Sequence, residues 1–96
     1  MRTCSTVHPG SVIGRLVTAD LSISDPRVSE AHALVSLRDR SLKLLALRGP
    51  LFIDGIEVDT VEVRPGMLIG LAEGLSLSVE SVNLPTHALM LCGAAP

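Results

Sequence analysis

Apolar and polar residues alternate along almost the whole chain, and this period of two limits the folds open to it. Leu21 and Ile23 alternate with polar residues, and so do Ala33, Val35 and Leu37. Successive side chains of a β-strand point to opposite faces, so this alternation predicts strands with one buried face. No long segment has the 3.6-residue period of an amphipathic helix.

Turn signals divide the alternating pattern into short segments. Asp54-Gly55 separates two apolar runs and favours a type I′ hairpin turn, because both turn positions need a positive φ. A Pro-Gly turn follows in residues 64–66. We therefore expect an all-β sandwich of two antiparallel sheets with about ten to eleven short strands. The expected strands lie near residues 2–7, 11–16, 20–24, 31–37, 42–47, 51–53, 56–58, 60–64, 67–72 and 75–82.

The composition favours one small domain with an aliphatic core. The chain has 96 residues, which is enough for a single core. Hydrophobic residues make up 47% of the sequence, but Phe52 is the only aromatic residue, so aliphatic side chains must fill the interior. We expect the sandwich in residues 1–83 and a tail, or the start of a linker, in residues 84–96. The tail segment "THALML" suits one helical turn or a further strand, and Leu89 and Leu91 could simply pack on the sandwich.

Charge and apolar runs argue against nucleic acid and membranes as partners. The formal net charge is −2, with 8 basic and 10 acidic residues spread along the chain. Arg38, Arg40 and Lys43 surround an expected turn, and no aromatic residue lies near them to stack on bases. No apolar run is long enough to span a bilayer. The start "MRTCSTVHPG" has no secretory pattern, so we expect a cytoplasmic protein, of bacterial composition.

The two cysteines, Cys4 and Cys92, lie near opposite ends of the chain. Two cysteines do not make a disulfide framework, and neither has the CxxC or Cys/His spacing that suits zinc. We therefore expect two free thiols in a reducing compartment, no metal site and no cofactor.

Ser29 and His32, with Asp25 nearby, are the residue types of a catalytic triad. A triad needs the base within hydrogen-bond reach of the hydroxyl and a third group that orients the base. No GxSxG motif surrounds Ser29, and a serine and a histidine three apart in a turn rarely point at each other. A structural role is favoured, in which Asp25-Pro26 starts a turn and the ring nitrogens of His32 span it. We expect no enzymatic activity.

Several short motifs occur in a distinctive order over roughly residues 10–82. They are Gly14-Arg15, then "SxxHA" beginning fourteen positions later at Ser29, then Asp54-Gly55, then "VRPGMLIGL". This ordered set resembles the forkhead-associated (FHA) domain. The resemblance implies an FHA-like β-sandwich that recognises phosphothreonine peptides through loops at one end.

The resemblance also implies roles for individual residues. Arg15 and Ser29 match the arginine and the serine that contact the phosphate in the family. A phosphothreonine brings about −1.5 to −2 charges and three acceptor oxygens, which suit the planar donor fork of an arginine. The positions that match structural residues of the family are Gly14, His32, Asp54 and Gly55.

Part of the ligand-binding pattern is missing. Glu30 stands where the family often has an arginine, and a carboxylate repels a phosphate. Counted back from the hairpin, the family segment Ser-x-Asn-Gly-Thr falls on residues 47–51. Gly49 therefore replaces the asparagine that holds the ligand backbone, and Pro50 removes a backbone donor. Arg48 could add a second cation at the phosphate, so Arg48 and Gly49 are the candidate binding residues of this segment.

Two functions follow from this pattern. The first is a phosphothreonine-binding interaction module of a signalling or regulatory protein, whose partner is another protein or a segment of the parent chain. The alternative is a degenerate FHA-like scaffold or homo-oligomerisation domain that works without phosphate, through an apolar face or an exposed sheet edge. Convergence of Arg15, Ser29 and Arg48 on an open surface would favour the first function. An ion pair of Arg15 with Glu30 or Asp54 would favour the alternative.

Overall fold

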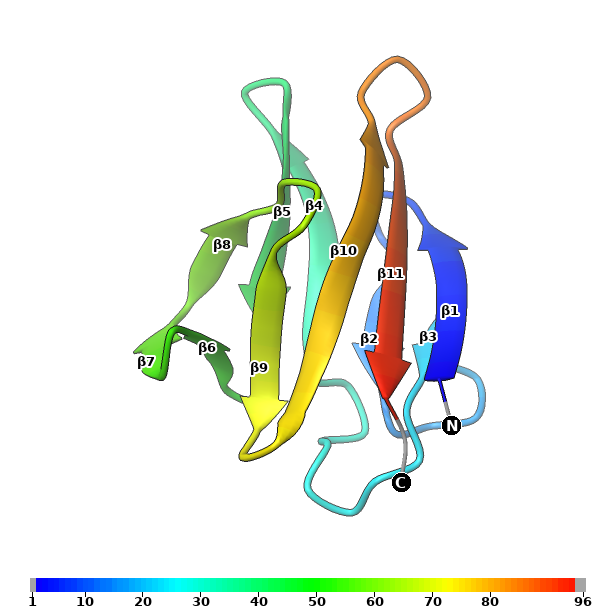
Figure 1. The fold of residues 1–96 in the computed structure, drawn as a ribbon. Coiled ribbons are helices and arrows are strands. Elements are labelled where there is room, and N and C mark those ends of the chain that lie inside the picture. Colours follow the sequence, from blue (N-terminus) through cyan, green and yellow to red (C-terminus); the bar gives the residue numbers. More distant parts are fainter. Residues whose placement is uncertain (1, 95–96) are drawn as a thin grey trace.

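The computed structural model describes residues 2–94, and these residues form eleven strands and no helix. Two sheets lie face to face, as Figure 1 shows. One has the strand order β1-β11-β10-β9-β6-β7 and the other β3-β2-β4-β5-β8. The expected all-β sandwich is thus confirmed. The strands are β1 (Arg2–Val7), β2 (Val12–Gly14), β3 (Leu21–Ser22), β4 (Ala33–Arg38), β5 (Ser41–Ala46), β6 (Leu51–Ile53), β7 (Ile56–Val58), β8 (Thr60–Glu62), β9 (Leu68–Ala72), β10 (Leu75–Asn83) and β11 (Ala88–Ala94).

The hairpin between β6 and β7 shows how the local sequence sets the register. Asp54 and Gly55 have φ of 50° and 79°, the two positive values that a type I′ turn requires. The turn puts Ile53 opposite Ile56 in the ladder. At the Pro-Gly turn, Gly66 has φ of 87° and provides the positive φ needed there.

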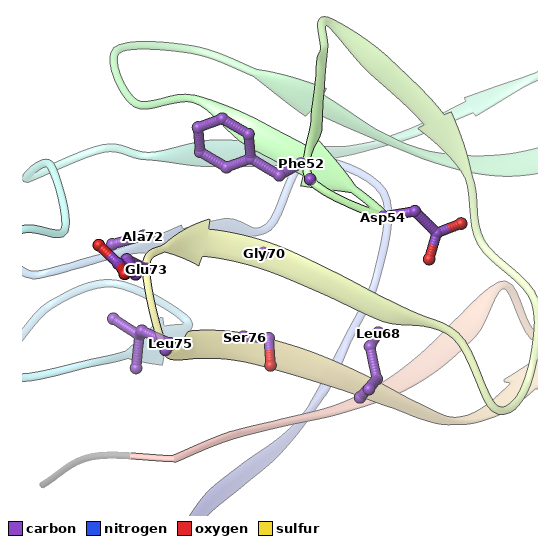
Figure 2. A pocket seen from close by; sticks show the side chains of 10 residues that line it. Phe52, Asp54, Leu68, Gly70, Ala72, Glu73, Leu75 and Ser76 are labelled. Carbon is purple, nitrogen blue, oxygen red and sulfur yellow. The ribbon is translucent and has the colours of Figure 1, made fainter.

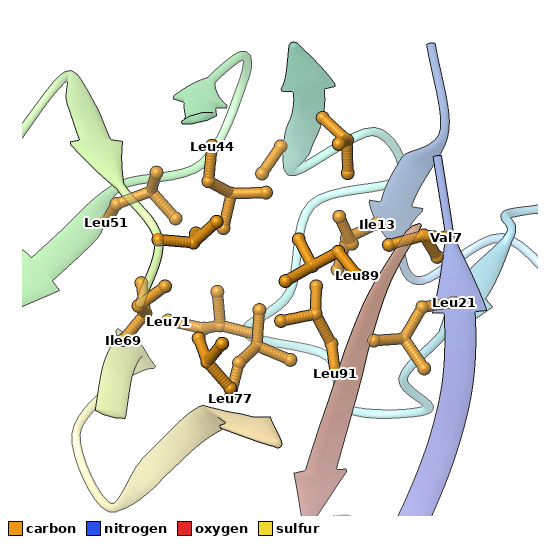
Figure 3. Packing of buried hydrophobic residues seen from close by; sticks show 14 of the residues in the cluster. Val7, Ile13, Leu21, Leu44, Leu51, Ile69, Leu71, Leu77, Leu89 and Leu91 are labelled. Atoms are coloured by element: carbon orange, nitrogen blue, oxygen red, sulfur yellow. The ribbon is translucent and has the colours of Figure 1, made fainter. Parts of the chain in front are cut away.

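The core between the sheets is aliphatic. Ile13, Leu44, Leu77 and Leu91 come from both sheets and have no exposed surface; their packing is shown in Figure 3. Complete burial of such a side chain contributes about 1.5–3 kcal/mol. Phe52 is absent from the buried cluster and is only partly buried.

The C-terminal segment belongs to the sandwich. Residues 88–94 form β11, which pairs with β1 on one side and with β10 on the other. Leu89 and Leu91 are fully buried. Of the alternatives that the sequence left open for this segment, the structure has the strand, with both leucines packed in the core.

The expectation of two free thiols is wrong, because Cys4 and Cys92 form a disulfide. Antiparallel pairing of β1 with β11 puts these two residues directly opposite each other, with their Cα atoms 4.0 Å apart. Their separation of 88 residues left no local signal in the sequence. The bond joins the edge strand β1 to its neighbour β11.

Candidate functional site

Three connecting segments meet at one end of the sandwich: residues 15–20 after β2, 23–32 after β3, and 47–50 after β5. The first two lie at the lower end in Figure 1. The backbone NH of Arg15 donates to the carbonyl of Ser29 at 3.0 Å, and the NH of Arg48 donates to the carbonyl of Ala31 at 3.2 Å. These bonds hold the three segments together.

His32 lies at the centre of this end and is completely buried. Its Nδ1 accepts a hydrogen bond from the backbone NH of Ser29 at 3.0 Å, and its Nε2 lies 2.6 Å from the carbonyl oxygen of Pro50. The hydrogen-bond network therefore assigns the neutral tautomer with the proton on Nε2. The imidazole thus bridges the segment that carries Ser29 and the segment that carries Arg48.

None of the hydrogen bonds described for the chain joins the hydroxyl of Ser29 to His32. The hydroxyl donates instead to the carbonyl oxygen of Arg48 at 3.1 Å. Both ring nitrogens of His32 are engaged with backbone groups, so the histidine has no free nitrogen to act as a base on Ser29. The hydrogen bond on which a triad depends is absent between these two described residues.

Arg15 lies beside Ser29 and is partly fixed. Its Nε donates to the carbonyl oxygen of Val28 at 3.0 Å. Its Nη2 lies 3.9 Å from Oε1 of Glu30, with 44% and 64% of the two side chains exposed. A long pair in such an exposed place contributes little, so the outer part of the guanidinium stays accessible to an anion.

Two glycines allow the segments to approach this closely. A Cβ on Gly14 would collide with the backbone carbonyl of Glu30, and a Cβ on Gly49 would collide with the imidazole of His32. Backbone and a buried ring cannot move aside cheaply. In this loop conformation, the position of the family asparagine has no room for any side chain.

Sequence reasoning missed an ion pair that supports the same end. The Asp25 carboxylate is 3% exposed and accepts hydrogen bonds from the backbone NH, Nε and Nη2 of Arg27, at 2.8, 3.1 and 3.0 Å. These hydrogen bonds lower the pKa of Asp25 below its ordinary value. Nη1 of Arg27 donates to the carbonyl of Glu73 at 2.6 Å and so ties this loop to the β9–β10 turn. The sequence Asp-Pro-Arg indicated only a turn.

Asp54 and Gly55 form the β6–β7 turn, and no hydrogen bond or ion pair described for the chain joins them to Arg15, Ser29 or Arg48. Within residues 2–94 no three His, Cys, Asp or Glu side chains gather in a way that could hold a metal ion. The same residues contain no helix with the length and apolarity needed to cross a membrane.

Solved structures share this fold. The FHA-2 domain of the ABC transporter Rv1747 from Mycobacterium tuberculosis matches with a TM-score of 0.62 and 24% identity, over 75% of this chain and 68% of that one. Rv1747 FHA-1 matches with a TM-score of 0.62 and 14% identity, over 99% and 98%. Mycobacterium tuberculosis EmbR, solved with a low-affinity phosphopeptide, matches with a TM-score of 0.60 and 16% identity, over 94% and 24%.

Comparison with curated proteins finds no significant match. The family model described as the FHA domain, in contrast, matches residues 11–72, well over half of the sequence. The matched segment contains all three loops at the candidate site. FHA domains in general are interaction modules that bind phosphothreonine rather than enzymes. The chain belongs to the FHA domain family.

Proposed function

We propose that this domain binds a phosphothreonine peptide with Arg15, Ser29 and Arg48 around the phosphate. One observation carries the proposal. The backbone NH of Arg15 donates to the carbonyl of Ser29, and the hydroxyl of Ser29 donates to the carbonyl of Arg48, so three residues far apart in sequence are neighbours in the fold.

The chemistry of these residues suits a phosphate. Arg15 and Arg48 are both exposed, and their guanidinium groups can donate several charge-assisted hydrogen bonds. The hydroxyl of Ser29 bonds only a backbone carbonyl in the free protein, so it can rotate to donate to a phosphate oxygen instead.

The proposed peptide contact is weaker than the phosphate contact. Gly49 has no side chain to hold the ligand backbone, and Pro50 has no NH to donate. The phosphate would supply most of the binding energy, with little selection of neighbouring residues. We expect modest affinity and a strong dependence on ionic strength, since the cations are exposed.

Isothermal titration tests the proposal. The protein is titrated with a degenerate phosphothreonine peptide pool and with the same pool unphosphorylated. Heat is expected from the phosphorylated pool alone, and Arg15→Ala should weaken binding about tenfold or more, because it removes charge-assisted bonds. No phosphate-dependent heat from the wild type would overturn the proposal.

Arg64→Ala is the matched control. Arg64 is exposed and forms a long ion pair with Glu62 at 3.5 Å, so it resembles Arg15 in environment. It lies in the β8–β9 connection, at the opposite end of the sandwich from the β3–β4 loop (Figure 1). Its substitution should leave binding unchanged, whereas an equal loss would indicate a non-specific charge effect.

The second candidate is association without phosphate, and the Arg15–Glu30 pair is the observation that favours it. In this case Glu30 would neutralise Arg15 and the domain would act as a scaffold or homo-oligomer. Sedimentation velocity over a range of concentrations separates the two. A stable dimer with no phosphopeptide binding would favour the scaffold.

A further inference from the structure

An open groove crosses the outer face of the six-stranded sheet, and its lining does not include Arg15, Ser29 or Arg48. Figure 2 shows the residues that line it. Its volume is about 610 Å³. Its apolar lining comes from Phe52 on β6 and from Leu68, Gly70 and Ala72 on β9. Asp54 and Glu73 also line it.

The groove follows a weak seam in the sheet. The register between β6 and β9 contains one pair, Phe52 opposite Gly70. Gly70 contributes no side chain, and an added Cβ would lie 3.2 Å from the Cβ of Phe52. The glycine therefore keeps open the middle of the groove, which almost any other residue would fill.

The groove presents unusual apolar surface to solvent. Leu68 is 64% exposed although it lies within a strand. Phe52 is the only aromatic residue of the chain, and it lies at this groove rather than in the core. Apolar surface gathered in a concave site favours a partner that removes it from water.

Carboxylates mark both ends of the groove. Asp54 follows Phe52 by two positions and Leu68 precedes Gly70 by two, so antiparallel pairing puts both at one end. Glu73 follows Ala72 at the other end. No lysine or arginine is among the described lining residues.

One cation does come close to this second end. The guanidinium of Arg27 donates a hydrogen bond to the backbone carbonyl oxygen of Glu73. The charge of Arg27 is already neutralised by its ion pair with the buried carboxylate of Asp25. The side chain of Glu73 therefore still gives this end of the groove an acidic character.

We infer that this groove docks an extended segment of a partner protein, with an apolar side chain over Gly70 and a basic residue on each flank. An extended chain advances about 3.3 Å per residue, so the five residues of β9 match basic residues four positions apart. The apolar residue between them packs on Phe52 and Leu68. The basic flanks lie near Asp54 and Glu73.

This docking does not need phosphate. The groove is acidic, whereas the proposed phosphate site presents Arg15 and Arg48. The two surfaces therefore select segments of opposite charge, and one partner could use both. The groove inference stands whether or not the phosphate site binds.

The test is an NMR titration with the peptide acetyl-GSKTLTKSG-amide, which has lysines four positions apart around a leucine. Amide shifts are expected to move at Gly55, Gly70 and Ala72. Affinity should fall about fivefold or more between low and high salt, because the flanking contacts are exposed ion pairs. The counter-peptide acetyl-GSETLTESG-amide should bind at least about tenfold more weakly, since it meets like charge.

Leu68→Ser should lower the affinity for the lysine peptide about tenfold, because the substitution removes an apolar anchor of the groove. Leu84→Ser is the matched control, because Leu84 is 49% exposed in the β10–β11 connection and should not matter. The double variant Asp54→Asn, Glu73→Gln should remove the preference for lysine over glutamate flanks. Asparagine tolerates the positive φ at position 54, so the turn should persist.

Arg15→Ala should leave binding of the lysine peptide unchanged, which separates this test from that of the phosphate site. The inference is overturned if no groove amide moves at millimolar peptide, if both peptides bind equally, or if Leu84→Ser weakens binding as much as Leu68→Ser.

Discussion

The two ends of the sandwich are built by different means. At the end that carries Arg15, Ser29 and Arg48, two connections are long, residues 15–20 and 23–32, and the buried side chains of Asp25 and His32 hold the second of them. At the opposite end (Figure 1) the connections have two to five residues, and the side-chain hydrogen bonds described for them span three residues. There the NH of Thr86 donates to Oδ1 of Asn83 at 3.2 Å, and the NH of Met67 donates to the carbonyl of Arg64 at 3.2 Å.

The difference shows where the fold places its buried polar groups. Among residues 2–94, the buried polar or charged side chains are Asp25 and His32, and both fix the longer connections. A buried polar group destabilises a fold unless its hydrogen bonds are made, so it acts as a constraint on the loops that bond it. Loops held in this way can present a binding site without a ligand to order them.

His32→Ala should have the largest effect on stability. It removes the acceptor for the NH of Ser29 and the donor for the carbonyl of Pro50, and it leaves a cavity at a fully buried position. We expect a loss of about 3–5 kcal/mol in the free energy of unfolding. Urea unfolding measures it, and a loss below about 1 kcal/mol would show that the loops do not depend on the imidazole.

Gly49→Ala should lower the free energy of unfolding by about 2–3 kcal/mol, less than His32→Ala. The loss arises because the added Cβ collides with the ring of His32. Gly66→Ala at the opposite end should cost about 1 kcal/mol, since nothing lies within 4 Å and only its φ of 87° is unfavourable.

Asparagine variants at positions 49 and 66 separate the effect of a steric collision from the effect of a positive φ. Asparagine tolerates a positive φ, so Gly66→Asn should be milder than Gly66→Ala, whereas Gly49→Asn should be no milder than Gly49→Ala. Gly49→Asn should also fail to improve phosphopeptide affinity in titration. If it binds more tightly and stays folded, the loop can move and the steric argument for Gly49 is wrong.

Features that depend on local sequence were predicted well. Alternation located β1 to β10, and Asp54-Gly55 and the Pro-Gly turn located two connections, because each is decided within a few residues; β11 lies in the segment that was expected to be a tail. The disulfide and the contact of Gly49 with His32 depend on strand pairing and loop packing across the chain, so no local pattern reveals them. The roles of Arg15, Ser29 and Arg48 at a phosphate came from family resemblance and stay a prediction until titrated.

Asp25→Asn should reduce stability less than His32→Ala and should change its pH dependence. The hydrogen bonds from Arg27 lower the pKa of Asp25 below 3.8, so the folded state favours the ionised form. This contribution is present at pH values above the ordinary pKa and is lost as the pH falls through the lowered one. Thermal midpoints of the wild type should therefore drop between about pH 5 and pH 2, and those of Asp25→Asn should drop less.

Glu80→Gln is the control for that pH series. Hydrogen bonds from Ser78 and Arg2 also lower the pKa of Glu80, but its pair with Arg2 lies on the surface at 2.9 Å, with the side chains 36% and 58% exposed. Glu80→Gln should change the fall of the thermal midpoint at acid pH less than Asp25→Asn does, and this change should become smaller at high ionic strength. If Glu80→Gln reduces the acid-induced fall in thermal midpoint as much as Asp25→Asn does, the buried Asp25–Arg27 pair contributes no more to the pH dependence than the surface pair.

Asn83→Ala should have the smallest effect, below about 0.5 kcal/mol in urea unfolding. The NH of Thr86 that Asn83 bonds is in an exposed turn, so water replaces the lost acceptor, whereas the acceptor that the NH of Ser29 loses in His32→Ala belongs to a fully buried ring. A loss above about 1 kcal/mol would show that the local bonds of the short turns matter as much as the buried groups of the long loops. The contrast between the two ends would then rest on length alone, and the rigidity argued for the phosphate loops would lose its physical basis.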